Sequence, residues 1–142
     1  MDRRVAKELL HIRDWLSLAN DIVMRGRDVY AADGLLQEAG DSLMMKLGEA
    51  AGRLARAEVE PPSGMVWTDA IANRNWLIHQ YDEIDRALTW VTLSRDLASW
   101  RMALADTFRL PEVSYPHLAT PTTTSSHPRT TLPSHSPSRA SS

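Results

Sequence analysis

The sequence lacks several features that would assign it to particular classes of protein. It contains no cysteine, which excludes disulfide bonds and thiolate metal sites. No apolar run approaches the roughly 18 residues of a membrane span, and the first residues contain no apolar signal-peptide core. The formal net charge of −2 provides no overall positive field for nucleic acid. We therefore expect a cytoplasmic protein without a membrane segment, in which any phosphate site is local.

What is present is a helical pattern of apolar residues, in a chain long enough for one domain with its own core. Apolar residues recur at steps of three and four, and no segment shows the strict alternation of a half-buried strand. The segments with this pattern are residues 3–24, 34–57, 67–79 (or to 81) and 83–108. The connections are short, among them Pro61-Pro62-Ser63-Gly64. The sequence predicts an all-α fold, an up-and-down four-helix bundle within residues 1–110.

Two of these helices allow more specific predictions. In residues 34–57, Gly40, Gly48 and Gly52 indicate close approach of a neighbouring helix, because a glycine costs up to about 1 kcal/mol in a helix relative to alanine. The last helix is expected to begin at a cap formed by Asp82. Its expected buried side consists of Ile84, Leu88, Val91, Trp100 and Leu104.

Residues 111–142 are predicted to be a disordered tail rich in proline, serine and threonine. From residue 116 to residue 142, seven serines, six threonines and five prolines make up 18 of 27 residues. Such a segment buries too little apolar surface to offset the entropy lost on ordering. His117, His127 and His135 are too widely spaced to indicate a metal site.

The chemically richest stretch is Arg74-Asn75-Trp76-Leu77-Ile78-His79-Gln80-Tyr81. Helical phasing places Arg74 at the centre of an apolar stripe with Trp67 and Ile78. A guanidinium in such a place keeps its charge, so it requires a carboxylate, a subunit interface or an anionic ligand. Glu49 is a candidate partner, and a purely structural ion pair with Arg74 is one interpretation of the stretch.

Arg-Asn-x-x-x-His-x-Tyr at residues 74–81 resembles the motif of the HepT-like toxins, which belong to the HEPN superfamily of small all-helical ribonucleases. Lys46-Leu47-Gly48-Glu49-Ala50-Ala51 resembles the second helix of that family, and Trp67-Thr68-Asp69-Ala70-Ile71 resembles the approach to its catalytic helix. Ile84-Asp85 and Trp90 follow at about the spacing of the family, so that the resemblance covers roughly residues 5–105. Gln80 departs from the pattern, since many relatives have a small residue there.

The resemblance implies a metal-independent endoribonuclease without a cofactor, in which Arg74 and His79 are catalytic. Such cleavage requires a base for the 2′-hydroxyl, an acid for the 5′-oxygen and positive charge for the phosphorane. Histidine is the only residue type in this stretch that titrates near neutral pH, so His79 suits the acid–base role. Arg74 can clamp the phosphate. Asn75, one turn before His79, is expected to orient the imidazole or to bind a phosphate oxygen.

We also expect the protein to form a homodimer and to be controlled by a separate antitoxin. Arg74 and His79 differ by about 140° around the helix axis, which is awkward for joint action within one subunit. A two-fold homodimer, as expected for HepT-like proteins, would place two such pairs around one cleft. The resemblance further implies the toxin of a type VII-like toxin–antitoxin system. An MntA-like nucleotidyltransferase antitoxin would attach AMP to Tyr81, and the added charge and bulk would exclude the RNA substrate.

Two other functions are open from the sequence. A non-catalytic HEPN-type partner would bind nucleotide, or position substrate, for a separate nucleotidyltransferase. A purely structural dimeric bundle would use Arg74 only as a buried ion-pair residue. The intact arginine–histidine pair favours the ribonuclease, because a pure binding partner has no need of it.

Overall fold

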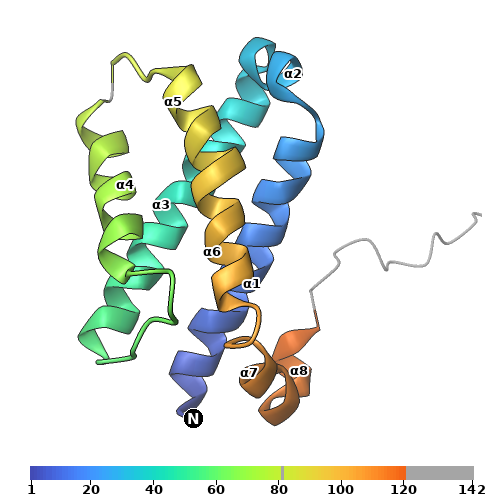
Figure 1. Cartoon of the computed structure of the whole chain (residues 1–142), viewed down its shortest axis with the longest axis vertical. Helices are drawn as coiled ribbons and strands as arrows, with labels where there is room; N and C mark the ends of the chain where they lie inside the picture. Colours follow the sequence, from blue (N-terminus) through green and yellow to red (C-terminus); the bar gives the residue numbers. More distant parts are fainter. Residues whose placement is uncertain (81, 121–142) are drawn as a thin grey trace, which may run out of the picture.

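The computed structural model describes residues 1–80 and 82–120, and within these residues it contains helices and no strand. Four long helical segments run up and down the molecule (Figure 1). They are α1 (Arg3–Met24), α3 (Gly34–Arg56), α4 (Trp67–His79) and a composite segment. The composite segment is formed by α5 (Arg86–Val91), a π-helical turn (Thr92–Asp96) and α6 (Leu97–Leu104), and the short α2 (Arg27–Ala32) joins α1 to α3. The predicted all-α bundle is confirmed.

The hydrophobic core is built from the faces of α1 and α3 that the apolar spacing predicts. The core side chains of α1 include Leu9, Ile12, Leu16 and Ala19, each of which is at most 2% exposed. Those of α3 include Leu43, Leu47, Ala50 and Leu54. Steps of three and four residues return to the same side of a helix, so one continuous apolar face on each helix is covered by the other segments.

The buried side of the last helical segment agrees with the prediction at Trp100 and Leu104 but differs near its start. Leu88 and Val91 are 50% and 40% exposed, whereas Thr89 is buried. Thr89 lies about one turn before the buried Leu93, but a threonine is not counted in an apolar pattern. The Thr89 hydroxyl is accommodated because it forms a hydrogen bond with the Tyr30 hydroxyl at 2.6 Å.

Aspartate side chains cap three of the helices. Asp2 and Asp33 accept hydrogen bonds from backbone N–H groups at the starts of α1 and α3. The predicted cap at Asp82 is wrong, because α5 begins at Arg86 and is capped by Asp85. The Asp85 carboxylate accepts from the backbone nitrogens of the second and third helical residues at 3.0 and 3.3 Å. Both aspartates meet the local criterion for an N-cap, so sequence alone does not choose between them.

The chain remains helical past residue 110, where the disordered tail was predicted to begin. Helices α7 (Arg109–Ser114) and α8 (Pro116–Ala119) lie against the first half of α1 (Figure 1). Arg13 connects them, because its guanidinium donates to Glu112 at 3.0 Å and to the carbonyl oxygen of Ala119 at 2.6 Å. These long-range contacts order a segment whose composition is typical of disorder. Residues 121–142 of the predicted tail, including His127 and His135, lie outside the described residues.

Candidate active site

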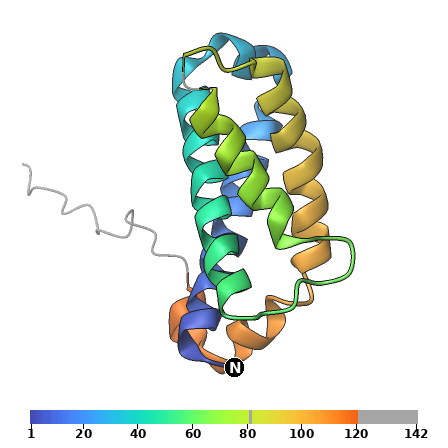
Figure 2. The same ribbon diagram turned by 90° about the vertical axis from the view of Figure 1, so that its left-hand side faces the viewer.

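Helix α4 carries the candidate catalytic residues and lies along α3 (Figure 2). The two helices approach closely at Gly48, which is buried. A Cβ at this position would overlap the Cβ of Arg74 and would lie 2.8 Å from the carbonyl oxygen of Ala70. A carbonyl oxygen of a helix cannot move aside easily, so the crossing requires a residue without a side chain. The close packing of α3 against α4 thereby determines the position of the Arg74 side chain between the two helices.

The other two glycines of α3 behave differently. A Cβ on Gly40 would lie 3.0 Å from a terminal methyl group of Leu93, which is a close contact with a flexible side chain. A Cβ on Gly52 would meet only the Arg56 guanidinium of the same helix, at 3.4 Å. The predicted close helix approach is therefore present at Gly48 and Gly40 and is not found at Gly52.

The guanidinium of Arg74 is held loosely by the described part of the protein. Its Nε lies 3.6 Å from Oε1 of Glu49, the partner expected from the sequence, and the Arg74 side chain is 32% exposed. That distance is too long for a hydrogen bond. Nη1 donates to the Asn75 side-chain oxygen at 3.4 Å, and the buried Nε has no hydrogen-bond partner among the described residues. A permanently charged group with so few protein contacts is available to an anionic ligand.

The buried face of α4 is turned from the predicted one. Trp67, Ala70 and Leu77 are its buried residues, whereas Ile78 is 43% exposed. Arg74 lies between Trp67 and Ala70 around the helix axis, so its stem remains on the buried face, against Gly48, although the side chain as a whole is 32% exposed. Ile78 is left exposed because α4 packs mainly on one neighbour, α3.

Asn75 and His79 are exposed on α4, and His79 is the last residue of the helix. Their spacing of four places them on the same flank. No hydrogen bond within the described residues connects His79 with Arg74. Tyr81, the predicted modification site, lies outside the described residues.

A groove of about 250 Å³ opens between α3 and α4 beside Arg74. Its lining includes three arginines, Arg53, Arg56 and Arg74, and one carboxylate, Glu49. The sequence analysis did not single out Arg53 and Arg56. They follow Glu49 by four and seven residues, which places all three on one side of α3, and this spacing is a signal that was available in the sequence. The groove is a local positive site in a chain of net charge −2.

Arg53 is the best anchored of these cations. Its Nε and Nη2 donate to the two carboxylate oxygens of Glu8 at 2.6 and 3.1 Å, which connects α3 to α1. The hydrogen bonds that Arg53 donates to Glu8, although opposed by some loss of hydration, raise the pKa of Arg53 above its ordinary value. Arg56 is exposed and has no ion-pair partner within the described range. The groove therefore combines one fixed cation with two that are free to adjust to a ligand.

Among the described residues, no group of three or more histidine, aspartate or glutamate side chains is arranged to hold a metal ion. Within residues 1–80 and 82–120, none of the helices has both the length and the apolar character to cross a membrane.

Comparison with known proteins assigns the chain to a family. The family model described as "Ribonuclease HepT-like" matches residues 12–106, a range that holds the larger part of α1, the other three long helical segments, and Arg74, Asn75 and His79. No curated protein and no solved structure matches the chain. The match covers well over half of the 142 residues and supports nuclease activity in general. The chain belongs to the HepT-like ribonuclease family, within the HEPN superfamily.

Proposed function

We propose that the protein is the toxin of a type VII-like toxin–antitoxin system and cleaves RNA without a metal ion. The observation that carries the proposal is the state of Arg74: its charge is only loosely paired with Glu49, and it faces a groove that also contains Arg53 and Arg56. In a member of a ribonuclease family, such a groove suits the phosphates of an RNA strand.

The proposed reaction is a transesterification within the RNA. A base removes the proton of the 2′-hydroxyl, and the 2′-oxygen forms a bond to phosphorus while the bond to the 5′-oxygen breaks. An acid donates a proton to the departing 5′-oxygen, so the products carry a 2′,3′-cyclic phosphate and a 5′-hydroxyl. His79 is the acid–base residue, and Arg74 stabilises the negative charge of the phosphorane. Asn75 orients the imidazole or binds a phosphate oxygen.

This chemistry works best in a homodimer. Base and acid are needed on opposite sides of the phosphate, and one chain offers one histidine at this place. A second copy packed on the exposed flank of α4 would add its own arginine and histidine to the same cleft. The partial exposure of the apolar Ile71 and Ile78 on α4 supports this arrangement, because a partner helix would cover them.

Control by an antitoxin follows from the motif. Tyr81 comes two residues after His79, and an MntA-like nucleotidyltransferase would transfer AMP to its hydroxyl. The phosphate of the adenylate would pair with the arginines that otherwise bind RNA. The modified protein would be inactive because its own adenylate occupies the substrate site.

The alternative is a non-catalytic HEPN-type partner that binds nucleotide or substrate for a nucleotidyltransferase. Two observations favour it: the arginine groove would bind phosphate without help from His79, and no hydrogen bond joins Arg74 to His79 among the described residues. The ribonuclease is preferred because it gives both motif residues a role.

Cleavage of RNA by the purified protein, expressed without antitoxin and assayed in excess EDTA, separates the two functions. The ribonuclease predicts cyclic-phosphate ends and loss of cleavage in Arg74→Ala and His79→Ala, together with growth inhibition that His79→Ala relieves. Equal inactivity of wild type and both variants, with mass spectrometry showing an unmodified Tyr81, would contradict the ribonuclease and leave the binding partner as the leading function.

A further inference from the structure

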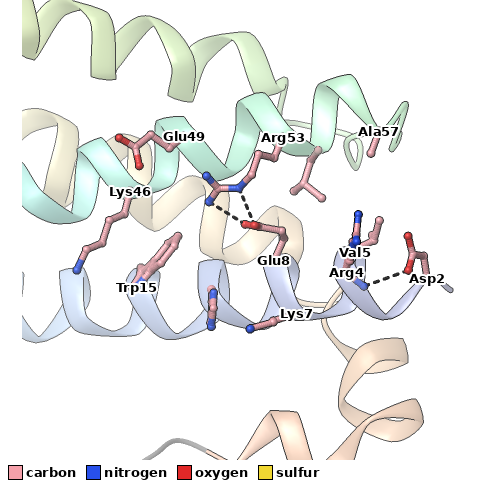
Figure 3. Close-up of a pocket in the computed structure, with 12 residues that line it drawn as sticks. Asp2, Arg4, Val5, Lys7, Glu8, Trp15, Lys46, Glu49, Arg53 and Ala57 are labelled. Carbon is pink, nitrogen blue, oxygen red and sulfur yellow. Dashed lines mark hydrogen bonds and ion pairs between the residues drawn. The ribbon is translucent and has the colours of Figure 1, made fainter.

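A second and larger depression lies between α1 and α3, next to the arginine groove. Its volume is about 660 Å³, which is within the range of ligand-binding pockets. Figure 3 shows Glu8 and Trp15 of α1 and Lys46, Glu49 and Arg53 of α3 around this cleft. We refer to it as the α1–α3 cleft. None of the catalytic roles assigned above uses it.

The α1–α3 cleft contains an aromatic surface. His11 and Trp15 are one turn apart on α1, and their ring centroids are 5.4 Å apart with an angle of 35° between the planes. His11 is exposed and Trp15 is partly buried, so the pair extends from the core to solvent. Aromatic rings at the edge of an open cleft are the usual support for an unpaired nucleobase, since every base offers a face for stacking.

The charges around the cleft favour an anion. Arg4, Lys7, Lys46 and Arg53 line it, and the arginine groove adds two more cations. The two depressions together hold six lysine or arginine side chains and three carboxylates, whereas the whole chain has a net charge of −2. The positive charge is therefore concentrated on this side of α3. Such a local excess attracts a polyanion and raises its rate of association.

The cleft and the groove are adjacent parts of one surface. Glu49 and Arg53 line both of them. Glu8 holds the Arg53 side chain at the boundary of the cleft and the groove. An RNA strand that passes from the Arg74 groove across Arg53 would therefore enter the α1–α3 cleft. This continuity distinguishes the cleft from an isolated surface pocket.

We propose that the α1–α3 cleft binds a nucleotide of single-stranded RNA that flanks the scissile phosphate. The base stacks on His11 and Trp15, and its phosphate is bound by Lys46 and Lys7. The inference rests on the proposed ribonuclease function for the identity of the strand, and it adds a substrate subsite that lies outside the Arg74–His79 motif.

Binding is tested with a fluorescein-labelled oligouridylate, by anisotropy, in a His79→Ala background that keeps the RNA intact. Lys46→Ala should weaken binding several-fold and reduce the slope of log Kd against log salt by about 0.7, the value for one lost phosphate contact to a single strand. His11→Ala should weaken binding without changing that slope, because stacking releases no counterions. Arg27→Ala removes a similar exposed charge from α2, away from the cleft, and should bind like its parent.

Three results would overturn the subsite. One is unchanged binding in both Lys46→Ala and His11→Ala. Another is an equal loss in Arg27→Ala, which would indicate a diffuse charge effect. The third is a lower molecular mass of the cleft variants in solution, which would assign the cleft to an interface between two copies of the chain.

A cleavage assay keeps the subsite separate from the proposed function. Lys46→Ala and His11→Ala should raise KM for an oligoribonucleotide but leave cleavage of the dinucleotide UpA unchanged, because UpA is too short to reach the cleft. If the wild type cleaves neither substrate, the ribonuclease proposal fails while the anisotropy result still decides whether the cleft binds RNA. Equal effects of both variants on the two substrates would contradict a flanking subsite.

Discussion

Gly48 in α3 lies directly against Arg74 in α4: a Cβ on Gly48 would overlap the Cβ of Arg74 and would be 3.0 Å from its Cδ. The position of the candidate catalytic guanidinium thus depends on a glycine 26 residues earlier in the chain. This contact links the stability of the α3–α4 pair to the geometry of the arginine groove.

Replacing this glycine should affect folding and activity together. We expect Gly48→Ala to lower the free energy of unfolding by about 1–3 kcal/mol, as overpacking of a close contact does, and to reduce RNA cleavage because α4 must shift. Gly52→Ala is the matched control on the same helix. The new methyl group would have only the flexible Arg56 guanidinium nearby. This variant should be more stable by about 0.5–1 kcal/mol, because alanine loses less backbone entropy on folding than glycine does. Urea unfolding measures both, and equal stabilities of the two variants would refute the tight crossing.

Arg74→Lys should greatly reduce RNA cleavage while changing the free energy of unfolding only slightly. The lysine keeps the positive charge and the aliphatic stem over Gly48 but loses the planar pair of donors. The existing ion pair to Glu49 is long and partly exposed, so its loss should change the free energy of unfolding by less than about 1 kcal/mol. Cleavage should fall by a factor of about 10²–10³, the usual effect of removing one stabilising donor from a transition state. A lysine variant with wild-type kcat would show that a simple charge is sufficient there.

The two partners of the buried Tyr30–Thr89 hydrogen bond should differ in how much stability is lost when each is replaced. Thr89 also donates to the carbonyl oxygen of Arg86 at 3.1 Å, so the Tyr30 hydroxyl is the donor toward Thr89. Thr89→Val leaves that buried donor without its acceptor and should cost about 1–3 kcal/mol, whereas Tyr30→Phe removes the donor itself and should cost about 1 kcal/mol. Thermal unfolding of the two single variants and the double variant measures the coupling. A larger loss in Tyr30→Phe would contradict this assignment of the donor.

Asp96 should make the protein less stable as its carboxyl ionises. Asp96 is an exposed residue, but partial loss of hydration of its carboxyl group, and then the Asp69 carboxylate, raise its pKa above the ordinary value of 3.8. The folded state therefore holds this proton more tightly than the unfolded state, and stability falls as pH rises through the folded pKa. Asp96→Asn should have a higher Tm than wild type at neutral pH, and the difference should disappear below pH 3.8. A Tm difference that does not change with pH would show that the charge of Asp96 is not its cause.

Much of this protein is determined by its sequence alone. Steps of three and four residues predict α1 and α3 and their buried sides, because a helix face is a property of neighbouring residues. The order of the helices and the Arg74–His79 motif are likewise local, as is the close approach signalled by Gly48. The family match over residues 12–106 agrees with the resemblance read from these patterns.

Only the tertiary structure decided the rest, because it depends on how separate helices rotate and cross. The crossing at Gly48 places the stem of Arg74 against α3, and its guanidinium lines one groove with Arg53 and Arg56. Packing also placed Thr89 in the core, where a hydrogen bond from another helix offsets its polarity. In the same way, contacts with Arg13 on α1 hold α7 and α8 in a segment whose composition predicts disorder. Periodicity describes one helix at a time, whereas these contacts join residues that are distant in sequence.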